Sequence, residues 1–116
     1  MQPQRWNNIP REKLSDTLER QVVWGERSTL ARFRLGQGTH ISKHKHENEQ
    51  CTCMLEGAMK MNLAGQEFTL RAGDVLVIPP WAEHEVWVLE DAVVLDFFSP
   101  PRQDWRQGQH QYLQGK

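Results

Sequence analysis

The sequence has few cysteines, no long apolar run and no excess of charge of one sign, and each absence removes a class of protein. Its 116 residues contain only Cys51 and Cys53, which excludes a disulfide scaffold. The 14 Lys+Arg and 15 Asp+Glu residues form neither a basic stripe nor an acidic tail, so no nucleic-acid partner is indicated. The chain shows no signal peptide and nothing near the ~20 apolar residues of a membrane span. We therefore expect one soluble, cytoplasmic domain of residues 1–116.

Short apolar or alternating runs, separated by turn residues, fill the chain from about residue 18 to residue 100. This pattern is typical of an all-β sandwich or barrel. The expected strands are residues 18–25, 29–38, 50–57, 58–65, 68–73, 74–80, 83–90 and 92–98. We expect a hinge at Gly57, a hairpin turn within residues 63–67, a turn at Glu90 and Asp91, and a short buried strand at 74–80 that stops at Pro79. The first 17 residues and the segment after Pro100 are expected to be irregular, apart from a short helix at 102–106.

The two cysteines lie on one expected strand and alternate with polar residues. If that strand is regular, Gln50, Thr52 and Met54 face inward and Cys51 and Cys53 face outward as two free thiols. The outward apolar set is Cys51, Cys53, Leu55 and Trp87. Because this set is too apolar for solvent, we expect it to be buried in a homodimer.

His44 and His46 are two residues apart, so on a strand their imidazoles project to the same side. Taken alone, such a pair is either a solvent-facing pair or two ligands of a metal ion. A tetrahedral zinc site built from both histidines, Cys51 and Cys53 has suitable ligand types. The alternation argues against it, because the cysteines face away from the inward side.

The spacing of glycine, proline and histidine resembles the two sequence motifs of the cupin superfamily. The first motif has five residues between Gly38 and His44, with His46, Gln50 and Gly57 following; the second reads Gly73, Pro79, His84. The resemblance covers about residues 30–100. It implies a small double-stranded β-barrel, or jelly roll, in which His44, His46 and His84 bind one divalent metal ion at the barrel mouth.

Two positions depart from the general cupin pattern. Gln50 stands where the usual ligand is glutamate, and Trp81 stands where the second motif usually has glycine. A neutral amide ligand leaves the full positive charge on a bound ion, which favours Lewis-acid chemistry over iron–oxygen chemistry. Gln50 is either the fourth ligand or a neighbour that hydrogen-bonds beside a three-histidine site.

Asp96 lies within the apolar stretch "VVLDFF", where a carboxylate needs a partner. By alternation Val94, Asp96 and Phe98 share a face, and the two prolines at 100 and 101 could turn Arg102 back towards it. One interpretation is a structural Asp96–Arg102 bridge; the other is a functional group.

The order His-x-His-x-x-x-Gln followed by Asp-x-Phe-Ser-Pro-Pro-Arg resembles the pectin-degradation (KdgF-type) cupins, which linearise 4,5-unsaturated monouronates by ring opening and tautomerisation. The resemblance implies that His44, His46, Gln50 and His84 hold the metal. It assigns the substrate and catalytic group to Asp96, Phe98 and Arg102. The metal is zinc, nickel, manganese or iron, and the uronate comes from pectin or alginate. A non-catalytic sugar-binding cupin, a dioxygenase and a sugar isomerase are the alternatives.

Overall fold

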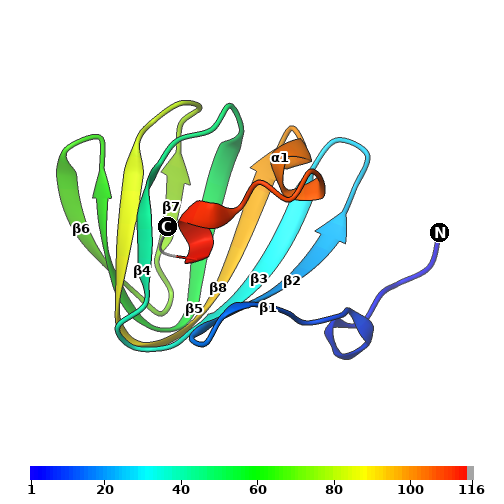
Figure 1. The fold of residues 1–116 in the computed structure, drawn as a ribbon, viewed down its shortest axis with the longest axis horizontal. Helices are drawn as coiled ribbons and strands as arrows, with labels where there is room; N and C mark the ends of the chain where they lie inside the picture. The colour runs from blue at the N-terminus through cyan, green and yellow to red at the C-terminus, as the bar shows by residue number, and fades with distance from the viewer. Residues whose placement is uncertain (115–116) are drawn as a thin grey trace.

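The computed structural model describes residues 1–114, and most of them lie in antiparallel β-strands (Figure 1). The strands are β1 (Glu12–Ser15), β2 (Leu18–Trp24), β3 (Thr29–Leu35), β4 (His40–His44), β5 (Glu49–Leu63), β6 (Gln66–Arg71), β7 (Val75–Ile78) and β8 (His84–Ser99). The helical elements are η1 (Trp6–Asn8), α1 (Gln103–Arg106) and η2 (Gln111–Gln114). The all-β fold expected from the sequence is confirmed.

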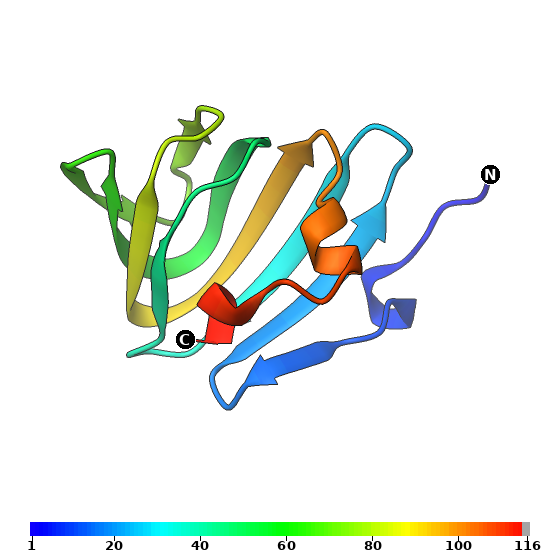
Figure 2. The same ribbon diagram turned by 45° about the horizontal axis from the view of Figure 1, so that its top comes forward.

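Two long antiparallel strands, β5 and β8, form the central pair of the barrel. They pair along their lengths, from Gln50 opposite Phe98 to Leu63 opposite His84. The first half of β5 also pairs with β7 and its second half with β6. The last part of β8 pairs with β3 and its first part with β4. All eight strands therefore belong to one sheet, which curves around an interior (Figures 1 and 2).

The central pair bends where Gly57 of β5 passes β8. Gly57 has φ +81°, and a Cβ atom there would lie 2.1 Å from the backbone oxygen of Asp91. Only glycine fits this position, so a bend at Gly57 is confirmed, and the strand register shifts around it. The two separate strands expected on either side of Gly57 are wrong, because β5 continues through it. The turn expected at Glu90 and Asp91 is wrong, because β8 continues through both residues. A bend supplied by the opposite strand lets β8 change direction without ending.

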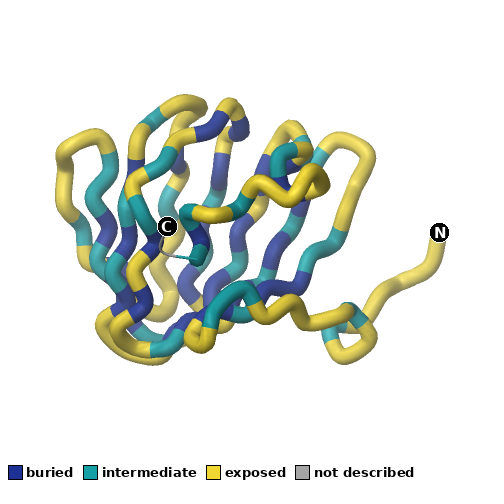
Figure 3. Tube along the Cα trace, viewed as in Figure 1, coloured by how far each residue is buried: buried dark blue, intermediate teal, exposed yellow. Residues whose placement is uncertain are grey.

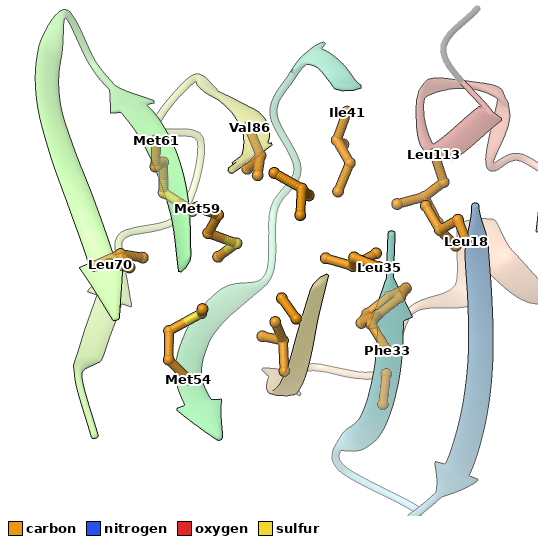
Figure 4. Close-up of a cluster of buried hydrophobic side chains, with 14 of the residues drawn as sticks. Leu18, Phe33, Leu35, Ile41, Met54, Met59, Met61, Leu70, Val86 and Leu113 are labelled. Atoms are coloured by element: carbon orange, nitrogen blue, oxygen red, sulfur yellow. The ribbon is translucent and has the colours of Figure 1, made fainter. Parts of the chain in front are cut away.

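The barrel interior is filled by the inward faces of the strands. Buried and less buried positions alternate along the strands (Figure 3). In β3 Ala31, Phe33 and Leu35 are buried, whereas Arg32 and Arg34 alternate with them on the other face, as expected. Side chains of β5, β6, β8 and the C-terminal η2 complete the same core cluster (Figure 4). The short strand expected to be buried at 74–80 is buried on one face only: Ile78 is inside, whereas Val75 and Val77 are exposed.

The chain ends contain more structure than their composition suggests. β1 pairs with β2, with Glu12 opposite Arg20, so the expectation of an irregular stretch up to residue 17 is wrong for residues 12–15. The helix expected at 102–106 is confirmed as α1. Among residues 1–114, no helix has the length and apolar character needed to cross a membrane.

Candidate metal centre

The structure brings together the three histidines that the two motifs contain. His44 ends β4 and lies opposite His84, the first residue of β8. His46 follows in the loop before β5, so the loop, and not strand alternation, turns its ring towards the other two. Each histidine offers one nitrogen, and these three nitrogens lie within 4.8 Å of one another.

Backbone carbonyl groups fix the orientation of all three imidazoles. The Nδ1 atoms of His44, His46 and His84 lie 2.7, 3.0 and 2.9 Å from the carbonyl oxygens of Ser42, Asn48 and Ala82. Because a carbonyl oxygen only accepts, each Nδ1 must carry the proton. Each Nε2 is therefore an unprotonated acceptor, and that of His84 is buried without a hydrogen-bond partner within the described chain. This is the arrangement of metal-binding histidines.

Gln50 adds a fourth acceptor to the cluster. Its amide nitrogen donates to Thr52 Oγ1 at 3.0 Å and to Asp96 Oδ1 at 3.2 Å, which directs its Oε1 towards His46. The Oε1 atom lies 3.1 Å from His46 Nε2. Neutral His46 has only one ring proton, so it cannot donate both to the Asn48 carbonyl and to Gln50 Oε1. With the proton on Nδ1, the Nε2 and Oε1 atoms are both acceptors, and a cation bound by both would relieve their repulsion. The donor set of three imidazoles and one amide oxygen therefore fits a divalent metal ion.

The protonation of the histidines agrees with ligation. Burial lowers the pKa of His44 to about 3 and that of His46 to about 4, and it also lowers the pKa of His84. All three rings are therefore neutral near pH 7, which is the form that binds metals.

Asp96 lies next to this cluster on the inward face of β8. Its Oδ1 accepts hydrogen bonds from the Thr52 hydroxyl at 2.7 Å and from the Gln50 amide. Burial raises the pKa of Asp96 to about 6, although both hydrogen bonds oppose the rise. The carboxyl group can therefore gain and lose a proton near neutral pH.

The structural bridge between Asp96 and Arg102 considered above does not form. Arg102 pairs instead with Asp104, with Nε 3.0 Å from Oδ1 and Nη2 2.7 Å from Oδ2. Asp104 is only two residues away, in the helix α1 that begins directly after Arg102, so a bidentate pair forms there at little cost in chain entropy. Thr52 and Gln50 satisfy Asp96 in its place.

Phe98 and Arg102 are both buried and line the same interior cavity as Asp96. The Arg102 guanidinium carbon lies 4.7 Å from the centre of the Phe98 ring. Phe98 also packs edge-on against His46 and Trp105, with ring centres 5.7 and 5.1 Å apart. Phe98 thus supports the ring of a candidate ligand as well as the cavity wall.

The sequence analysis missed the C-terminal residues of the site. The ring of Tyr112 stacks on His44, with centres 4.0 Å apart and planes at 23°. Its hydroxyl oxygen accepts from Arg102 Nη2 at 2.6 Å and from Trp105 Nε1 at 2.9 Å. The sequence signal was an apolar pair, Tyr112 and Leu113, within an otherwise polar tail.

The zinc site with two cysteine ligands is excluded. Gln50, Thr52 and Met54 are buried on the inward face, as the alternation predicts, so Cys51 and Cys53 face the other way. Both cysteines are free thiols.

The family model described as "Cupin domain" matches residues 31–98, which is more than half of the chain. The chain therefore belongs to the cupin family, in agreement with the fold and with the placement of the three histidines.

Three solved structures similar to this chain are an RmlC-like cupin, a KdgF protein and a predicted oxalate decarboxylase. An RmlC-like cupin from Shewanella frigidimarina has a TM-score of 0.83 at 24% identity, over 88% of this chain and 93% of that one. KdgF from Halomonas sp. has a TM-score of 0.79 at 26% identity, over 85% of this chain and 93% of that one. A predicted oxalate decarboxylase from Thermotoga maritima matches with a TM-score of 0.74 at 20% identity, over 83% and 96% of the two chains. The first and third support the fold alone. Comparison with curated protein sequences gave no match.

Proposed function

We propose that this cupin is a metal-dependent enzyme that converts 4,5-unsaturated monouronates to their linear keto form. The observation that carries the proposal is the hydrogen bond between Gln50, a candidate metal ligand, and Asp96, a buried carboxylate in the same cavity as Arg102 and Phe98. The motif Asp-x-Phe-Ser-Pro-Pro-Arg at residues 96–102 also supports the proposal, and so does the 26% sequence identity to KdgF from Halomonas sp..

The reaction is an isomerisation and needs no oxidant or added water. The substrate is a cyclic hemiacetal whose ring oxygen is part of an enol ether. Removal of the anomeric hydroxyl proton forms the C1 carbonyl and breaks the bond between C1 and the ring oxygen. The ring oxygen keeps the electron pair and becomes an enolate, and return of the same proton to C4 then gives the C5 ketone. One acid/base group that accepts and returns a proton is sufficient.

Asp96 is suited to that role by position and by its raised pKa. Thr52 and Gln50 hold its Oδ1, so the carboxylate is fixed beside the candidate ligands. A divalent ion held by the three histidines and Gln50 would polarise the substrate oxygens that it binds. The buried Arg102 guanidinium supplies a positive charge for the substrate carboxylate.

A direct assay tests this proposal. Purified protein loaded with a divalent metal is mixed with unsaturated monouronate generated by a polysaccharide lyase, and the linear keto product is followed by NMR. We expect product to form faster than in buffer, with loss of the conjugated double-bond absorbance and no oxygen consumption. A conversion rate equal to that of buffer, with protein that is folded and metal-loaded, would contradict the proposed activity.

A further inference from the structure

A C-terminal segment covers the candidate metal centre. α1, residues 107–110 and η2 lie across the open side of the curved sheet, between β4 and β2 (Figures 1 and 2). Tyr112 lies on this segment and stacks on His44, and Leu113 is buried in the same core cluster as Leu18 and Ile41. Gln114 adds a hydrogen bond from its amide to the backbone oxygen of Leu14 in β1. The segment therefore closes the barrel mouth over the histidines.

The closed arrangement leaves too little room for a sugar. The interior cavity, which His44, Asp96, Arg102 and Tyr112 help to line, has a volume of about 40 Å³. That is space for roughly three water molecules, whereas a six-carbon sugar acid is several times larger. As long as the Tyr112 ring lies on His44, a uronate cannot reach both Asp96 and the candidate ligand atoms.

The backbone offers a place for the segment to move. Gly108, between α1 and η2, has φ +77°, and a Cβ atom there would have nothing within 4 Å. Residues 106–109 are exposed to solvent. Before Gly108, α1 is anchored to the barrel by Trp105, which is buried in the core, and by the Arg102 backbone N–H, which donates to Thr29 Oγ1 at 3.0 Å. Arg102 also forms an ion pair with Asp104 within this segment. After it, the Tyr112 hydroxyl is held by hydrogen bonds from Arg102 and Trp105, which can break without disturbing that ion pair.

We propose that residues 109–114 form a lid that moves about Gly108, and that Tyr112 is the residue that must leave His44 for a sugar to reach the site. The lid is inferred from the stacking, the cavity and the glycine. Only the identity of the sugar, a uronate, rests on the proposed function.

The chain offers a sharp reporter, because Tyr112 is its one tyrosine. Protein labelled with 3-fluorotyrosine gives a single fluorine resonance, whose relaxation by a soluble gadolinium chelate measures how often the ring is exposed. In Gly108→Ala the closed backbone becomes strained, so we expect the open fraction to rise about 5- to 30-fold. Gly65→Ala is the matched control, because Gly65 has φ +86° and open space around it but lies in the β5–β6 hairpin.

Both variants are first compared with wild type by thermal melting, so that global unfolding is not mistaken for lid opening. A Gly108→Ala protein that is folded but whose fluorine is no more exposed than in Gly65→Ala would overturn the lid. As an independent measurement, Leu113→Ala, which weakens the anchor of the lid in the core, should also expose the fluorine. If neither Gly108→Ala nor Leu113→Ala exposes the fluorine, the lid is overturned as well.

Adding ligand separates the lid from the proposed function. Saturated D-galacturonate is titrated into the labelled, metal-loaded wild type, with D-galactose as the neutral control and calorimetry as the independent measure of binding. We expect galacturonate to move the fluorine resonance towards its position in Gly108→Ala. If calorimetry detects binding of galacturonate while the fluorine resonance stays unchanged, the lid is overturned. No binding of galacturonate, with Tyr112 exposed in Gly108→Ala, would support the lid and remove the uronate function.

Discussion

Gln50 and Asp96 are joined by a hydrogen bond inside the barrel, with the Gln50 amide nitrogen 3.2 Å from Asp96 Oδ1. The Thr52 hydroxyl donates to the same oxygen at 2.7 Å and accepts from the same amide at 3.0 Å. This small triangle ties a candidate metal ligand to the candidate acid/base residue. A change at either end therefore alters the surroundings of the other.

Replacing Asp96 by asparagine tests its chemical role. Asp96→Asn keeps the shape and one acceptor oxygen but cannot take a proton, so we expect turnover of unsaturated uronate to fall by about a hundredfold or more. Because burial raises the pKa of Asp96, the charged carboxylate is unfavourable at pH 7, and the neutral amide should leave the Tm unchanged or higher. Metal content should stay the same. A folded, metal-loaded variant with the wild-type rate contradicts the role.

Metal analysis tests the candidate centre. Protein purified without added metal should contain about one equivalent of a divalent ion, and His84→Ala should lose most of it. His40→Ala is the control, because His40 lies on the outer surface, paired with Glu85. Chelation should lower the Tm of the wild type but not that of His84→Ala, because an ion bound only to the folded state stabilises it. Full occupancy in His84→Ala would exclude this site.

Trp81 carries a local strain that can be measured. It has φ +65° and is 62% exposed, so its backbone adopts a left-handed conformation that is unfavourable for a bulky residue, and the side chain gains little burial in return. Trp81→Gly should raise the free energy of unfolding by about 1 kcal/mol. Trp81→Ala, which removes the ring but keeps the Cβ atom, should give no such gain. Equal chemical-denaturation midpoints for the two variants would show that the strain is absent.

The ion pair of Asp104 with Arg102 should give a pH-dependent stability. Burial alone would raise the pKa of Asp104, but the hydrogen bonds and charge of Arg102 outweigh it and lower the pKa below its ordinary value. The stability from this group is therefore complete above the unfolded pKa, near 4, and is lost as pH falls through the lower folded pKa.

Asp104→Asn should consequently destabilise the protein by about 2 kcal/mol near pH 7, since Arg102 loses its charge partner. The difference between wild type and variant should shrink below about pH 4. Urea unfolding at several pH values measures it, and a difference that is constant from pH 7 to pH 3 would contradict the assignment.

We also propose that the chain forms a homodimer through the outward face of β7, β5 and β8. In register, Val77 lies next to Cys51 and Cys51 next to Phe97, and the exposed fractions of Val77 and Phe97 are 51% and 44%. A continuous apolar row of this kind is typical of an interface. Phe97→Glu should give monomers in light scattering, whereas Leu89→Glu, at an exposed position in the other half of β8, should not. A wild-type monomer at micromolar concentration would contradict the dimer.

Much of this fold follows from patterns that are local in the sequence. The alternation of Ala31, Phe33 and Leu35 with arginines determines which face of β3 is buried, because side chains of a strand point to opposite sides in turn. The same parity separates Gln50 and Thr52 from the cysteines. The spacing of glycine, proline and histidine, through its resemblance to the cupin motifs, identifies three of the four candidate ligands, of which His44 and His84 lie at strand ends and His46 lies in the loop between β4 and β5.

Only the tertiary structure decided what depends on contacts between distant segments. β8 passes through Glu90 and Asp91 because Gly57, on another strand, allows the bend. Arg102 pairs with Asp104, and not with Asp96, because Thr52 and Gln50 already occupy the latter. Tyr112 stacks on His44 although the two residues lie far apart in the sequence. Strand period and motif spacing describe neighbours along the chain, whereas the closure of the barrel mouth is set by which distant side chains pack together.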